Sequence, residues 1–116
     1  MDFETIKPYL LPLGIAAYLL FRHFRFKIAK GKLRGLAAGG ALFVDVRTSA
    51  EFKEGNRPGS INTPLDEIAR QAGELDKNKP VVLSCASGTR SGIAAAILRK
   101  MGFRDVTNAG PWQNTL

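Results

Sequence analysis

Reactive and metal-binding side chains are scarce in this 116-residue sequence, which has a single cysteine, Cys85, and a single histidine, His23. One cysteine excludes an intramolecular disulfide, a Cys-x-x-Cys redox pair and a zinc site built from several cysteines. No histidine follows residue 35, which excludes a cysteine–histidine dyad within that part of the chain. We therefore expect no metal site and no cofactor.

Acidic residues are equally scarce near the N-terminus. Residues 1–35 carry seven Lys/Arg and two Asp/Glu, whereas residues 36–116 carry ten and eight. Most of the net charge of +7 therefore comes from one segment, Arg22 to Arg34, which has six basic residues and no acid. A basic cluster directly after an apolar stretch is typical of a segment that faces lipid headgroups. This position predicts that the protein has no nucleic-acid partner.

Long apolar runs are also few, and only one stretch, Tyr9 to Phe21, continues for thirteen residues without a charge. Extended to residues 6–26, it reaches a length that crosses a bilayer if the basic residues at its ends snorkel to the headgroups. We predict a single-pass anchor that contacts the lipid bilayer through residues 6–26. The positive-inside rule then places everything after Arg22 in the cytoplasm, beneath a bacterial inner membrane. An interfacial helix, a processed signal peptide and a soluble partner-binding helix remain as alternatives.

The composition changes near residue 36 and predicts two parts. Residues 1–35 form the anchor helix with its basic juxtamembrane segment, and residues 36–116 form a small domain. In the second part short apolar runs alternate with helical patterns, which indicates an α/β fold with a parallel sheet and crossover helices. The expected strands cover residues 41–46, 61–63, 81–84 and 106–108, and the expected helices begin at Thr48, with a capping box to Glu51, at Pro64 and near Ile93.

The segment from Cys85 to Arg90 is the strongest candidate for chemistry. It follows a buried strand and opens a helix, where ligands of open α/β sheets bind. Gly88 allows a tight loop whose amide groups point inward, and the helix dipole adds positive potential. These features predict an anion site and a lowered thiol pKa, which makes Cys85 a candidate nucleophile. The alternative is that Cys85 is an inert core cysteine.

The sequence resembles the single-domain rhodaneses, a family of sulfurtransferases, over residues 41–112. Several motifs carry this resemblance in the family's order: Val44-Asp-Val-Arg47, Glu51-Phe52, Gly55 to Pro64, Val81 to Ser91, Met101-Gly-Phe103, and Asn108-Ala-Gly110 with Trp112. Two positions depart from the family pattern, Asn56 in place of a frequent histidine and Ala86 in place of a frequent basic residue.

The resemblance implies a small rhodanese-like domain with a central, mostly parallel sheet flanked by helices, preceded here by the N-terminal hydrophobic helix. It also implies a sulfurtransferase in which Cys85 takes a sulfane sulfur from thiosulfate or a low-molecular-weight persulfide and passes it to a thiol or to cyanide. Cys85 and Arg90 are the expected catalytic residues, with Arg90 steering the anionic donor. The expected substrate-binding residues are Ala86, Ser87, Gly88, Thr89, Ser91, Asp45 and Arg47.

Three alternatives stay open at this point. Arg47 has the spacing to pair with Glu51, four residues later, instead of meeting a substrate. A phosphatase or arsenate reductase would use a similar cysteine loop, but it needs one residue more between the cysteine and the arginine. A catalytically silent membrane adapter or sulfur-binding module would keep the fold without turnover.

Overall fold

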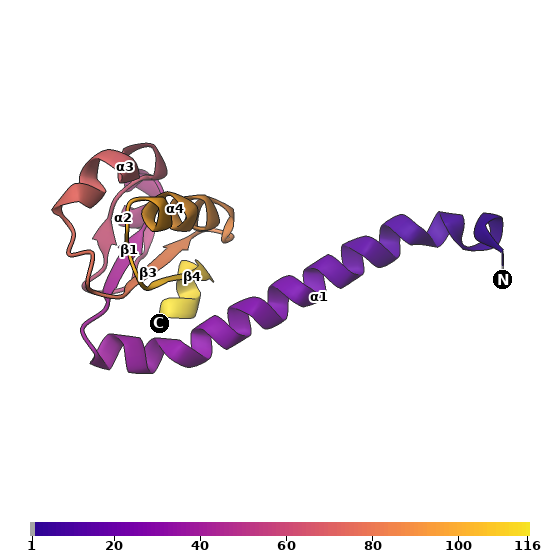
Figure 1. Ribbon diagram of the computed structural model, residues 1–116, viewed down its shortest axis with the longest axis horizontal. Helices are drawn as coiled ribbons and strands as arrows, with labels where there is room; N and C mark the ends of the chain where they lie inside the picture. Colours follow the sequence, from indigo (N-terminus) through magenta and orange to yellow (C-terminus); the bar gives the residue numbers. More distant parts are fainter. Residues whose placement is uncertain (1) are drawn as a thin grey trace.

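The protein consists of a long N-terminal helix and a small α/β domain. In the computed structural model, which describes residues 2–116, helix α1 covers Phe3–Ala38. Asp2 caps its first turn by accepting a hydrogen bond of 2.9 Å from the Thr5 N–H. The N-terminal half of α1 extends away from the domain, as Figure 1 shows, and its C-terminal half runs along the domain. The predicted division at residues 35 and 36 thus falls inside α1.

The domain is built on a four-stranded sheet with the order β2-β1-β3-β4. The strands are β1 (Leu42–Asp45), β2 (Ile61–Asn62), β3 (Val81–Cys85) and β4 (Val106–Pro111). Every pairing is parallel, so the C-terminal ends of β1, β3 and β4 lie at the same edge of the sheet. The register places Asp45 beside Ser84 and Cys85 beside Pro111.

Helices cover both faces of the sheet. One face carries the main core, in which Val44, Leu83 and Leu98 are buried together with side chains of α3 (Ile68–Gln71) and α4 (Thr89–Lys100). The other face is covered by α1, whose Leu33 packs against Val82 and the neighbouring Ala109. The central strand β3 is buried along its whole length, as its continuous apolar run predicts.

The predicted elements of the domain are confirmed with small shifts in their ends. Helix α2 (Ser49–Glu54) begins after Thr48, and the predicted capping box with Glu51 is present. The segment after Pro64 is less regular than predicted. It forms α3 as a single turn between the 3₁₀ turns η1 (Leu65–Glu67) and η2 (Ala72–Glu74). A further 3₁₀ turn, η3 (Trp112–Thr115), closes the chain.

The prediction of a single-pass membrane anchor over residues 6–26 is wrong. Within residues 2–116 no helix combines the length and the hydropathy that a membrane crossing needs. The uncharged run of α1 is only thirteen residues long, and any window of spanning length within α1 takes in charged residues at one or both ends of that run. The placement of the domain beneath an inner membrane, which depended on that anchor, is withdrawn with it.

Candidate functional site

The candidate site lies at the sheet edge where β1, β3 and β4 end. Cys85 is the last residue of β3, and Thr89 is the first residue of α4. Between them Gly88 adopts φ +99°, a left-handed conformation that turns the chain sharply into the helix. Ala86, Ser87 and Thr89 are exposed on the outside of this loop, whereas Gly88 is buried.

The thiol of Cys85 points into the loop and has no exposed surface. The N–H of Gly88 donates a hydrogen bond of 2.9 Å to its Sγ, and the Ser91 Oγ lies 3.3 Å away. Burial alone raises the pKa of the thiol. Hydrogen bonds from the Ser91 hydroxyl and from the backbone N–H groups of Ser91, Gly88 and Ser87 outweigh burial, so the pKa of Cys85 lies below its ordinary value.

A side-chain network from β4 holds this arrangement. Asn108 Oδ1 accepts hydrogen bonds from Ser91 Oγ (2.7 Å) and from the Gly110 N–H (2.9 Å), while its Nδ2 donates to the Gly88 carbonyl (3.1 Å). Ser91 has one hydroxyl hydrogen, so it can donate only one hydrogen bond at a time. When Cys85 is a thiol, Ser91 donates to Asn108 and accepts from the thiol. When Cys85 is a thiolate, the Ser91 hydroxyl can turn and donate to the sulfur. Rotation of the Ser91 hydroxyl therefore lets it donate a hydrogen bond to Cys85 once the thiol has lost its proton.

Asp45 and Arg47 form a buried ion pair at the end of β1. The Arg47 Nη2 lies 2.8 Å from Asp45 Oδ2, and the exposed fractions of the two side chains are 6% and 2%. Arg47 also donates to the Gly55 carbonyl at 2.7 Å, and its guanidinium lies 4.9 Å from the Trp112 ring centroid. Arg47 therefore pairs with Asp45 and not with the carboxylate of Glu51. Its contact with Glu51 is a hydrogen bond of 3.3 Å to the backbone carbonyl.

The carboxylate of Glu51 instead binds Arg90. The two guanidinium nitrogens of Arg90 donate hydrogen bonds of 2.7 and 2.9 Å to its two oxygens. Hydrogen bonds from Arg90 and from the Thr48 N–H lower the pKa of Glu51 to about 2. The pair thus stays ionised at neutral pH, and it ties α2 to the first turn of α4. Arg90 also lines a hollow of about 370 Å³ with Val46, Thr48, Pro64, Leu65 and Asp66.

Helix α1 reaches the same loop from the other side. Arg22 donates a hydrogen bond to the Ser87 carbonyl. The ring of Phe26 lies close to the backbone of Gly88 and Gly110. A Cβ atom at Gly88 would lie 2.5 Å from the ring, and a Cβ atom at Gly110 would lie 2.9 Å from the ring. Neither α1 residue was predicted in the site, because a basic and apolar helix carries no local signal of such a contact.

The structure brings the other sequence-predicted residues to one edge of the sheet, in two groups. The loop residues Ala86 to Ser91 surround the Cys85 thiol, whereas Asp45 and Arg47 pair with each other. Asn108 and Glu51 are the partners that were missed as site residues. Asn108 was visible in the sequence as part of the Asn108-Ala-Gly110 motif, and Glu51 as a helix cap and an alternative partner of Arg47, but no local signal linked them to Ser91 or Arg90. Within residues 2–116 no three His, Cys, Asp or Glu side chains are grouped as a metal site needs.

The lowered thiol pKa gives a direct expectation for reactivity. Alkylation of Cys85 by iodoacetamide, followed by mass spectrometry from pH 5 to 10, is expected to have its midpoint below ~8.5, the ordinary thiol value. Glu51 does not titrate in this range, so the midpoint reports Cys85. Ser91→Ala is expected to move the midpoint upward, because one donor to the thiolate is lost. A wild-type midpoint at or above the ordinary value would contradict this expectation.

Comparison with curated proteins yields several sulfurtransferases. The chain is similar to the thiosulfate sulfurtransferase PspE of Escherichia coli, with 37% identity over 70 residues that cover 59% of this chain and 67% of PspE. It is also similar to the putative sulfur carrier protein YrkF of Bacillus subtilis, with 38% identity over 68 residues, 59% of this chain and 37% of YrkF. The chain spans 37% of the length of YrkF, 54% of the uncharacterized protein YqhL of Bacillus subtilis and 63% of a sulfurtransferase of Allochromatium vinosum.

Solved structures share the fold of the domain. A structure described as rhodanese with anions from E. coli superposes with a TM-score of 0.61 and 35% identity over 65% of this chain and 91% of that chain. The human single-domain sulfurtransferase TSTD1 superposes with a TM-score of 0.63 and 29% identity over 72% of this chain and 88% of that chain.

The sequence profile of the Rhodanese-like domain matches residues 30–109, which is more than half of the chain. The match begins after Arg22 and Phe26, so the α1 residues that contact the loop lie outside it. The parallel sheet, the cysteine loop and this match agree, and the chain belongs to the rhodanese-like domain family.

Proposed function

We propose that this protein is a sulfurtransferase that carries a sulfane sulfur on Cys85. The observation that supports the proposal best is the environment of the thiol, in which backbone N–H groups and one hydroxyl converge on Sγ and lower its pKa. The same donors suit a persulfide, whose terminal sulfur is also an anion. Sulfurtransferases among the relatives support sulfur transfer as the general chemistry.

The proposed reaction has two steps. The Cys85 thiolate attacks the outer sulfur of a donor such as thiosulfate, a new S–S bond forms, the S–S bond of the donor breaks, and sulfite leaves with the electron pair. Cyanide or a thiolate then attacks the terminal sulfur of the persulfide, which releases thiocyanate or a new persulfide and restores the Cys85 thiolate. Neither step needs a metal or a further redox partner.

The residues around the thiol have separate parts in this proposal. Ser87, Gly88 and Ser91 hold the sulfur with their backbone N–H groups, while Ala86 and Thr89 form the exposed rim of the loop. Arg90 is the expected guide for an anionic donor, although its charge is balanced by Glu51. The buried pair of Asp45 and Arg47 supports the loop from β1. Because the thiol is fully covered, we expect donors to reach it after a local opening of the loop.

Intact-mass spectrometry tests the proposal directly. The purified full chain is incubated with thiosulfate or with glutathione persulfide, then with cyanide, alongside Cys85→Ser. We expect the wild type to gain the mass of one sulfur and to lose it as thiocyanate, while Cys85→Ser gains none. Absence of loading from both donors would refute the proposed transfer and favour a sulfur-binding or adapter role without turnover.

A further inference from the structure

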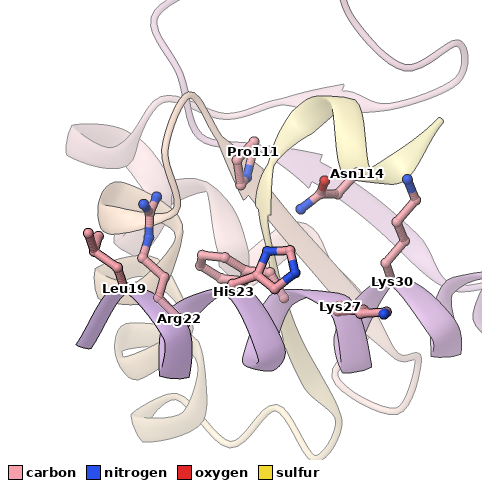
Figure 2. A pocket seen from close by; sticks show the side chains of 8 residues that line it. Leu19, Arg22, His23, Lys27, Lys30, Pro111 and Asn114 are labelled. Atoms are coloured by element: carbon pink, nitrogen blue, oxygen red, sulfur yellow. The ribbon is translucent and has the colours of Figure 1, made fainter. Parts of the chain in front are cut away.

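A groove separates the basic half of α1 from the C-terminal segment of the domain. Its volume is about 400 Å³, and its walls are formed by Leu19, Arg22, His23, Phe26, Lys27 and Lys30 of α1 and by Pro111 and Asn114 opposite them. Figure 2 shows Arg22 and Lys30 reaching from α1 toward the facing segment, with His23 between them. The groove is therefore an open channel bounded by cationic side chains.

The charge of this groove is not balanced by nearby acids. No Asp or Glu lines it, and none of the three ion pairs formed within residues 2–116 involves a residue of α1. The spacing of Lys27, Lys30 and Arg34 by three or four residues puts them on one side of the helix, with Lys27 and Lys30 in the groove. A row of cations without counter-charges attracts and orients an anionic partner.

The groove reaches the loop of the proposed nucleophile from the face of the sheet that α1 covers, whereas the Cys85 side chain lies with the main core on the other face. Pro111, on its wall, is the direct neighbour of Cys85 in the pairing of β3 with β4, and adjacent strands lie about 4.8 Å apart. Arg22 lines the groove and donates a hydrogen bond to the Ser87 carbonyl of the cysteine loop. A partner seated in the groove is therefore held next to the loop that carries Cys85.

We propose that this groove docks an acidic segment of the protein that exchanges sulfur with Cys85, an inference that rests on the proposed function. The groove lining runs along α1 from Leu19 to Lys30, about 16 Å at 1.5 Å per residue, which is the span of about five residues of extended peptide. This length exceeds what a small donor such as thiosulfate can occupy. The apolar end of the groove, at Leu19 and Pro111, suits an apolar side chain beside the acids.

A nucleic acid suits this groove less well. Single strands bind through exposed aromatic faces on which the bases stack. The one aromatic ring of the groove besides His23 is Phe26, and its ring is packed against Gly88 and Gly110. The groove therefore matches carboxylates spaced along a peptide better than a row of nucleotides.

The docked partner then completes the proposed reaction. Its thiolate attacks the terminal sulfur of the Cys85 persulfide, the S–S bond to Cys85 breaks, and a persulfide forms on the partner while the thiolate returns to Cys85. Charge and sulfur are conserved in this exchange. Binding in the groove raises the local concentration of the partner thiol near the loop.

Synthetic acceptor peptides test the docking. One peptide carries a cysteine and four glutamates, and its matched control carries glutamines at the same four positions. The rate of sulfur transfer from persulfidated full-length protein is measured by mass spectrometry, and the ratio of the two rates is compared between variants. We expect the wild type to favour the acidic peptide by about tenfold at low salt, with the preference lost at high salt.

Charge reversal inside the groove, compared with the same reversal outside it, separates the effect of the groove from general charge effects. Lys27→Glu with Lys30→Glu is expected to abolish the preference. The matched pair Lys32→Glu with Lys100→Glu makes the same charge change at exposed positions outside the groove and is expected to retain it. An unchanged preference in the first variant, or equal rates for both peptides in the wild type, would overturn the docking proposal.

Measuring peptide binding to a variant that cannot transfer sulfur tests the docking proposal separately from the proposed function. In the full-length Cys85→Ser variant, fluorescence anisotropy with the labelled acidic peptide and with a labelled oligouridylate measures the groove alone. Tighter binding of the acidic peptide, lost in Lys27→Glu with Lys30→Glu, supports the docking even if Cys85 never loads sulfur. Tighter binding of the oligonucleotide would overturn it, even if sulfur transfer occurs.

Discussion

Replacement of Asp45 by asparagine will lower the free energy of unfolding by about 3–5 kcal/mol, because it leaves the Arg47 guanidinium buried without its counter-charge. Arg47 is only 6% exposed, and the Asp45 carboxylate receives hydrogen bonds from its Nε and Nη2 as well as from its backbone N–H. The carbonyl of Gly55 and the Trp112 ring remain as partners, but neither carries a negative charge. Urea unfolding followed by circular dichroism measures the loss.

A second ion pair in the same domain provides the control. Arg70 and Glu67 lie 3.3 Å apart, with exposed side-chain fractions of 75% and 41%. Glu67→Gln removes a charge as Asp45→Asn does, yet it is expected to cost less than about 1 kcal/mol, because water replaces the lost partner. Equal costs for the two variants would show that Asp45 does not stabilise Arg47 as its burial implies.

Alanine at Gly88 is expected to slow persulfide formation on Cys85 by about 100-fold, because small displacements of reacting groups have effects of that size. Gly88 has φ +99°, which strains any residue with a Cβ by about 1–3 kcal/mol. The new Cβ would also lie 2.5 Å from the Phe26 ring and 3.2 Å from the Gly110 Cα. Either the ring or the loop must move, and the loop N–H that donates to Cys85 moves with it. Stopped-flow measurement of loading by thiosulfate gives the rate.

Gly102→Ala separates backbone strain from contact with α1. Gly102 has φ +97°, yet a Cβ there would meet nothing within 4 Å. We expect this control to lose stability by about 1–2 kcal/mol from the left-handed conformation alone and to load sulfur at the wild-type rate. Adding Phe26→Ala to Gly88→Ala should restore part of the lost rate. Wild-type loading by Gly88→Ala would contradict the role of this loop.

Much of the domain was predictable because the relevant signals are local. The continuous apolar run of β3 indicates a buried central strand, and Thr48 with Glu51 forms a capping box whose partners are three residues apart. Gly88, between a buried strand and a helix, indicated the loop that surrounds Cys85. In each case the residues that determine the structure are near neighbours in the sequence.

The same local reasoning failed for the long helix. Its apolar and basic composition suggested a membrane crossing, but the uncharged run is too short, and its neighbouring residues lower the hydropathy of any longer window. Composition also gave no indication that Leu33 packs on the sheet or that Phe26 covers two glycines of the site. These contacts depend on the path of α1 across the domain.

The candidate nucleophile Cys85, the loop around it and the succession of strands and helices along the chain could be predicted from the sequence, because short-range hydrogen bonding and apolar patterning specify them. The folded chain was needed to show which distant side chains meet at this loop. Glu51 and Arg90, 39 residues apart, pair because α2 follows β1 and α4 follows the adjacent strand β3. Asn108 reaches Ser91 because β4 lies on the other side of β3. Such pairings depend on which strands are neighbours, and strand order is a property of the whole folded chain.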